Sequence, residues 1–80
     1  SYGINMNDPD DILDFSSYKK QGMEKAVIFV NGVNKGKNYM PTMKYSEIEG
    51  IGTYSPGEST SIKYGKIGKY GVIEIITRKN

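Results

Sequence analysis

The sequence contains no cysteine and no histidine. Without cysteine the chain can form neither a disulfide nor a thiolate metal site. Without histidine it lacks the commonest general base and the commonest ligand of transition metals. A catalytic triad is excluded, and a dyad of Ser59 and Lys63 would need burial that an exposed helix face does not give. We therefore expect a protein that is not an enzyme and that uses no metal and no cofactor.

A strong excess of one charge is also missing, as is any long apolar segment. The 11 basic and 9 acidic residues leave a formal net charge of only +2, which argues against nucleic acid as a partner. No apolar run approaches the roughly 20 residues of a membrane-spanning helix. The chain opens on polar residues and not on a signal peptide, which we expect of a mature or trimmed form. Its 80 residues are enough for one small domain.

Two apolar segments predict the main strands. Residues 26–30 form a short run rich in β-branched side chains, typical of a strand buried on both faces, and we expect it to be central in the sheet. Asn31 and Gly32 follow at once, and this dipeptide favours a tight type I′ hairpin turn into a short polar strand. Residues 72–77 form the second apolar run, which only Glu74 interrupts.

The acidic segment Asp8-Pro9-Asp10-Asp11 has the features of a helix start, with an Asp cap, proline in the first helical position and acids in the first turn. We predict a helix over residues 9–20. The same acids, together with Asp14, would also suit a calcium ion. The segment lacks the glycine and the bidentate glutamate of a calcium loop, however, so capping is the preferred interpretation.

The segment Ser55-Pro56-Gly57-Glu58 has the pattern of a capping box, with Ser55 as the cap and Glu58 in the third helical position. A short helix should follow and end at Gly65. Upstream, residues 45–48 predict one helical turn and residues 51–54 a strand. Strands that alternate with helices predict an α/β (α+β) fold, with a small mixed sheet, a β-hairpin and two to three short helices.

Basic and aromatic residues alternate over residues 63–70, a combination that single-stranded nucleic-acid binding uses. The low net charge favours a solvated loop instead. The spacing of Gly65, Gly68 and Gly71 would suit a phosphate-binding loop, but it matches no nucleotide-binding motif. The end of a helix, a tight loop and the start of a strand explain the three glycines. The tyrosines in the predicted loops could form a surface on which carbohydrate rings stack. Alternatively, they pack against the protein and complete a small hydrophobic core. The candidate binding residues are Tyr39, Tyr54, Lys66, Lys69 and Tyr70.

Two segments resemble the plug domain of TonB-dependent outer-membrane receptors, and the starch-utilisation type is the closest variant. Residues 26–33 are similar to the first hairpin of the family, in which an apolar strand runs into Asp-Gly-Val and Asn31 here replaces the Asp. Tyr64-Gly65, a glycine-bearing loop, Gly71-Val72-Ile73 and residues 75–79 resemble the motif that closes the family's domain. On this basis we expect an N-terminal segment with one short helix, residues 1–24, and a plug-like domain, residues 25–80.

The resemblance implies a binding or gating module of a Gram-negative envelope protein, in the periplasm or associated with the outer membrane. Its partner would be an envelope protein or an outer-membrane barrel, with carbohydrate as one class of ligand. The alternative is a free-standing protein–protein interaction module with no transport role, and an open sheet edge would also allow a homodimer by strand addition. The residues expected to shape the motif are Asn31, Gly32, Ser55, Glu58, Tyr64, Gly65 and Gly71.

Overall fold

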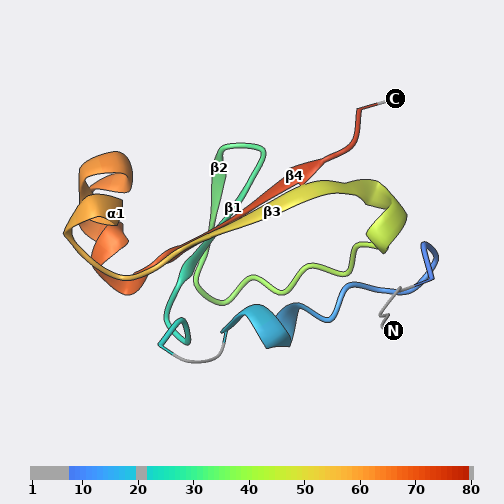
Figure 1. Ribbon diagram of the computed structural model, residues 1–80, viewed down its shortest axis with the longest axis horizontal. Coiled ribbons are helices and arrows are strands. Elements are labelled where there is room, and N and C mark those ends of the chain that lie inside the picture. The colour runs from blue at the N-terminus through green and yellow to red at the C-terminus, as the bar shows by residue number, and fades with distance from the viewer. Residues whose placement is uncertain (1–7, 20–21, 80) are drawn as a thin grey trace, which may run out of the picture.

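The computed structural model describes residues 8–19 and 22–79, which form a four-stranded sheet with short helices around it (Figure 1). The strands are β1 (Val27–Val30), β2 (Val33–Gly36), β3 (Ile48–Tyr54) and β4 (Val72–Thr77). The α-helix α1 (Glu58–Tyr64) lies between β3 and β4, and the shorter 3-10 helices are η2 (Phe15–Lys19), η3 (Tyr45–Glu47) and η4 (Gly65–Tyr70). The predicted mixed fold of one small sheet and short helices is confirmed.

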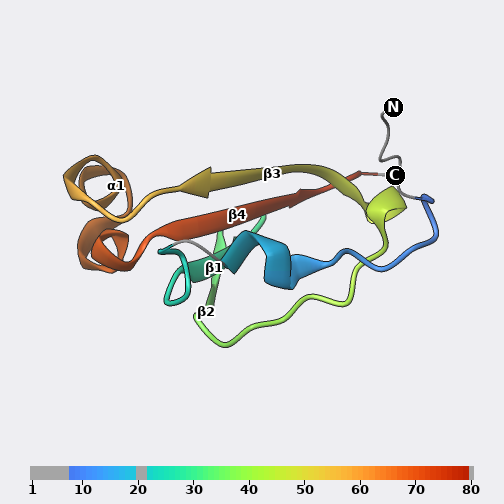
Figure 2. The same ribbon diagram turned by 60° about the horizontal axis from the view of Figure 1, so that its bottom comes forward.

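The strand order in the sheet is β2-β1-β4-β3. β1 and β4 pair in parallel, although the segments are far apart in the sequence, whereas β2 and β3 each pair with their neighbour in the antiparallel direction. The first strand is therefore central, as its uninterrupted apolar run predicts. The two edges of the sheet are β2, which is short, and β3, which is the longest strand (Figure 2).

The hairpin turn between β1 and β2 has the conformation that its sequence predicts. Asn31 and Gly32 both have positive φ, 51° and 84°, as a type I′ turn requires. The Asn31 side chain also joins the sheet: its Nδ2 donates to Thr77 Oγ1 (2.8 Å), and the Thr77 N–H donates to its Oδ1 (3.1 Å). The amide thus extends the parallel β1–β4 pairing past the end of β1.

Replacing Asn31 by alanine is expected to lower the free energy of unfolding by about 2 kcal/mol, because two hydrogen bonds are lost and alanine is strained at positive φ. Urea denaturation followed by circular dichroism measures this change. Asn38→Ala is the control, because Asn38 is exposed in the turn after β2 and has an ordinary φ. Equal denaturation midpoints for the two variants would show that the Asn31 amide contributes nothing.

The main hydrophobic core lies on one face of the sheet. Ile28 of β1 and Ile73 and Ile75 of β4 are fully buried there. Leu13 and Phe15 from the N-terminal segment cover them, so that η2, blue in Figure 2, packs beside β1 and β4. Because side chains alternate along a strand, the intervening residues of β1 and β4 point to the opposite face.

The predicted helix over residues 9–20 is wrong for the part that the structure describes, residues 9–19, where only η2 is helical. Asp8 closes a turn instead of capping a helix: its Oδ1 accepts from the Asp10 N–H (2.9 Å). Ile12 then forms a β-bridge with Lys44, and the Leu13 N–H donates to the Met43 carbonyl (2.8 Å). These tertiary bonds use the backbone groups that a helix would need.

The predicted capping box is also wrong, although its helix exists. α1 begins at Glu58, with Gly57 as the N-cap and no capping side chain. The Ser55 carbonyl, not its hydroxyl, takes part in the local structure and accepts from the Thr60 hydroxyl (2.6 Å). Gly65 ends α1 with a φ of 84°, as expected. The segment expected to be a solvated loop continues as η4.

Candidate binding groove

α1 and η4 cover part of the face of the sheet that lies opposite the main core. Val27 of β1 and Val72 of β4 are buried on this face, and Phe29 and Glu74 follow them along the two strands. We call it the helix face. Gly68 of η4 packs so closely on α1 that an added Cβ would lie 2.4 Å from the Ser61 nitrogen. The two helices therefore behave as one unit.

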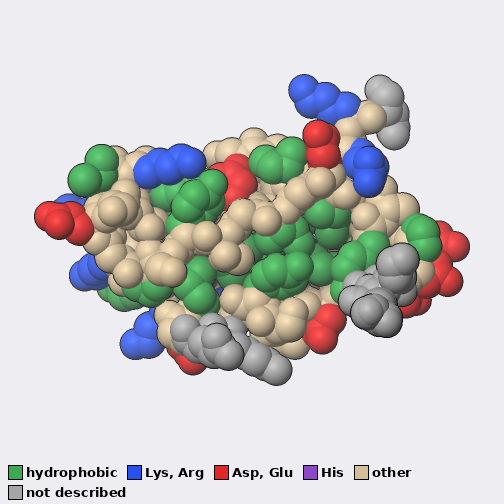
Figure 3. Space-filling model, viewed as in Figure 1, with side chains coloured by type: hydrophobic (Ala, Val, Ile, Leu, Met, Phe, Trp, Pro, Cys, Tyr) green, Lys and Arg blue, Asp and Glu red, His purple; other side chains and the backbone are tan. Residues whose placement is uncertain are grey.

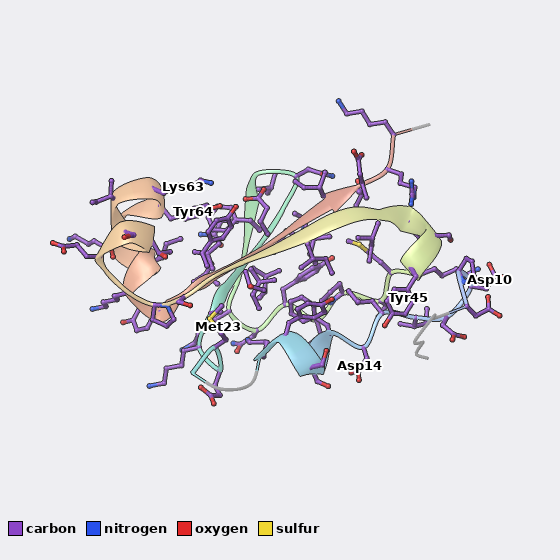
Figure 4. All side chains as sticks on the ribbon, viewed as in Figure 1. Asp10, Asp14, Met23, Tyr45, Lys63 and Tyr64 are labelled. Atoms are coloured by element: carbon purple, nitrogen blue, oxygen red, sulfur yellow. The ribbon has the colours of Figure 1, made fainter. Side chains whose placement is uncertain are left out.

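An aromatic cluster connects α1 to the helix face. The Tyr64 ring lies 5.2 Å from that of Phe29 and 5.4 Å from that of Tyr54, measured between centroids. Lys63 Nζ lies 4.6 Å from the centroid of the Tyr54 ring, a cation–π contact. Figure 4 shows Lys63 and Tyr64 at the end of α1, with Tyr64 toward the strands. The three aromatic residues of the cluster are half-buried, so contacts within the cluster cover part of each ring.

Glu74 fixes this cluster to the hairpin. Its Oε1 accepts from the Tyr64 hydroxyl (3.0 Å), and its Oε2 accepts from the Gly32 N–H (3.1 Å). Both carboxylate oxygens thus have protein donors, which favours a structural role over that of a general base. The sequence marks Glu74 as the one break in an apolar strand, but its partners come from two other elements.

The stability of the domain is expected to fall above about pH 10, because partial burial and the bond to Glu74 raise the pKa of the Tyr64 phenol above its ordinary value of 10.0. As the pH rises past that value, the unfolded chain loses the Tyr64 proton while the folded chain keeps it. The unfolded state is then favoured. Tyr64→Phe should reduce the loss of stability between about pH 9 and about pH 11, measured by urea denaturation. If the free energy of unfolding of Tyr64→Phe falls with pH as steeply as that of the original protein, Tyr64 is not the cause of the loss.

One hollow on the helix face is a groove of about 390 Å³ between the hairpin and η4. We call it the hairpin groove. Val27 forms part of its floor, and Ile67 and Tyr70 of η4 form one wall. The full lining is Lys25, Val27, Asn34, Gly36, Lys37, Ile67 and Tyr70. It therefore combines apolar surface with lysines and contains no acidic residue.

Charged side chains are distributed unevenly over the molecule. Figure 3 shows a group of acidic side chains at the end where the turn of residues 8–11 lies, and several basic side chains around α1 with an acidic one beside them. Other basic side chains lie near the C-terminus. In the described part of the chain, no group of three His, Cys, Asp or Glu residues is placed to hold a metal ion. The helices of residues 8–19 and 22–79 are all too short or too polar to cross a membrane.

The structure brings three of the five candidate binding residues together. Lys66, Lys69 and Tyr70 all lie on η4, where Lys69 Nζ is 5.1 Å from the centre of the Tyr70 ring. Tyr54 belongs to the aromatic cluster. Tyr39 packs against the main core, away from the other four. The tyrosines therefore do not form one continuous surface.

Sequence reasoning missed the other side of the groove. Lys25, Asn34 and Lys37 come from around the hairpin. They face η4 only because β1 pairs in parallel with β4, a contact between residues more than forty positions apart. Alternation along β2 places Asn34 on the opposite face from Lys35, but no local signal connects it with Tyr70.

Comparison with known proteins gives no match to a family model, to a curated protein or to a solved structure.

Proposed function

We propose that this chain is a non-enzymatic binding or gating module of a Gram-negative envelope protein, of the kind that the plug-domain resemblance implies. One observation carries the proposal. The two segments that resemble the plug domain, residues 26–33 and 64–79, form the neighbouring strands β1 and β4. Val27 of the first segment and Ile67 and Tyr70 of the second also line the hairpin groove, whose other lining residues come from the two ends of the hairpin. The residues of the resemblance thus make up one continuous part of the molecule, and the groove is its recognition surface.

The chemistry of the helix face supports binding rather than catalysis. Glu74, the carboxylate of β4, is engaged by two donors. Ser59 is exposed on α1, and Lys63 lies over two tyrosine rings, so the two do not form a buried dyad. A nucleophile activated by burial and by a neighbouring base is the usual requirement of covalent catalysis. The exposed lysines and Tyr70 of the groove are better suited to holding a ligand.

The edge strand β3 favours a second candidate, a protein–protein interaction module. β3 has seven residues, and Glu49 is its one charged side chain. β2, the opposite edge, has four residues and is protected by Lys35 within the strand and Lys37 after it. Long edges with few charges are the ones that accept an added strand. A partner chain or a second copy of this chain would pair there.

Cell fractionation separates the two candidates. Extracts of the source cells are divided into cytoplasm, periplasm and both membranes, and blotted with an antibody raised against this domain. We expect a band far above the 8.9 kDa of the chain, in the outer membrane. A soluble periplasmic band near 8.9 kDa would instead support the free-standing interaction module. A band confined to the cytoplasm would contradict both.

A further inference from the structure

The hairpin groove carries a more specific inference about its ligand. Its apolar surface comes from Val27, which is almost completely buried, from half-buried Ile67 and from the ring of Tyr70, which is 41% exposed. A partly exposed aromatic ring above an apolar floor is a surface on which a planar or apolar group can stack. The volume of about 390 Å³ lies in the lower part of the range of small-molecule sites.

The polar side chains around this floor are hydrogen-bond donors, namely two lysine ammonium groups and the neutral Asn34 amide. Lys25 and Lys37 are exposed at the rim, and no Asp or Glu is part of the lining. Lys66 and Lys69 flank Ile67 and Tyr70 on η4 and add to the positive potential. Glu24, an acid next to Lys25 in the chain, has a carboxylate that accepts from the Gly22 N–H (3.3 Å). Because the lining itself contains two lysines and no acid, the potential in the groove favours an anion.

Two contacts order the Asn34 amide and the backbone at Lys37 before any ligand arrives. Asn34 Oδ1 accepts from the Gly36 N–H (2.8 Å), so the orientation of the amide is set and its Nδ2 remains as a donor. Lys19 Nζ donates to the Lys37 carbonyl (2.6 Å), which ties the end of the hairpin to η2. A groove whose backbone and amide are already ordered loses less conformational entropy when it binds a ligand.

We propose that the hairpin groove binds a small organic anion, in which a carboxylate or a similar acid is attached to a planar or apolar body. The body lies on Val27, Ile67 and Tyr70, and the acid is held by Lys25, Lys37 and the Asn34 amide. This inference rests on the proposed function, because it assigns a ligand class to the recognition surface of the binding module.

The test is an NMR titration of the purified chain with 2-naphthoate and, separately, with 2-naphthalenemethanol, a neutral compound of similar shape. We expect naphthoate to shift the amide signals of Asn34, Gly36 and Ile67 and to bind at least about tenfold more tightly than the alcohol, because two lysines face its charge. Raising the salt concentration from about 50 to about 500 mM should lower the affinity for naphthoate but not the affinity for the alcohol.

A matched pair of double variants controls for net charge. The double variant Lys25→Gln with Lys37→Gln should bind naphthoate about tenfold more weakly. The double variant Lys35→Gln with Lys79→Gln removes the same charge outside the groove, and its affinity for naphthoate should be unchanged. Equal affinity for the two compounds, equal effects of the two double variants, or no shift at the groove amides would overturn the inference. The fractionation experiment does not depend on this ligand, so either result can fail while the other stands.

Discussion

Replacing Ile28 by alanine is expected to destabilise the domain by about 2–5 kcal/mol, because the change removes three buried carbons and leaves a cavity. Ile28 is fully buried in the central strand, beside Ile73 of β4. A domain of 80 residues has a free energy of unfolding of only about 4–12 kcal/mol in total. The variant should therefore be partly unfolded, or should unfold at a much lower urea concentration.

Ile62→Ala is the matched control for this prediction. It makes the same chemical change on α1, where the Ile62 side chain is 82% exposed. We expect a change in stability within about 0.5 kcal/mol. The measurement is urea denaturation at constant temperature, with the slope of the transition compared between variants so that a midpoint shift reports stability. Similar midpoints for the two variants would mean that the main core is not where the structure places it.

Replacing Gly68 by alanine is expected to destabilise the domain by about 3 kcal/mol, the upper end of the usual range for overpacking. An added Cβ would lie 2.4–2.5 Å from backbone atoms of Thr60 and Ser61, and backbone cannot move aside as a flexible side chain can. η4 must then separate from α1. Since η4 supplies Ile67 and Tyr70 to the hairpin groove, the affinity for naphthoate should fall as well.

Gly50→Ala is the control for Gly68→Ala. A Cβ added at Gly50, in the edge strand β3, would meet no heavy atom within 4 Å, and the φ of this glycine is ordinary. The substitution should leave stability unchanged or raise it by about 0.5 kcal/mol, by restricting the unfolded chain. Denaturation curves and naphthoate titrations of both variants check the pair. If Gly68→Ala behaves like Gly50→Ala, the close contact between α1 and η4 is wrong.

Several local features of this protein follow from short stretches of sequence. The Asn31-Gly32 turn adopts positive φ because these two residue types tolerate it best. The strands Val27–Val30 and Val72–Thr77 form where the apolar runs predict, and Gly65 ends α1 as a residue without a Cβ can. Each of these features depends on the conformational preference of a few neighbouring residues, or on the burial of an apolar run.

Local preference gave the wrong result where distant backbone groups competed for the same hydrogen bonds. Residues 8–11 have the residue types of a helix N-terminus. The backbone hydrogen bonds from Leu13 to Met43 and from Tyr45 to Asp11 nevertheless hold this part of the chain extended. Ser55 fits a cap by type and spacing, yet α1 starts at Glu58, where η4 packs against it through Gly68. A short helix obtains most of its stability from packing, so packing sets where it begins.

The candidate site divides in the same way. The residue types that can take part in binding are known from the composition: cysteine and histidine are absent, and the lysines and Tyr70 of η4 are present. The residues that they face depend on the fold. The parallel pairing of β1 with β4 brings Lys25, Asn34 and Lys37 to η4 and leaves Tyr39 on the other side of the sheet. A sequence pattern describes residues that are close along the chain, whereas the groove is formed by residues that are distant in sequence and that only the fold brings together.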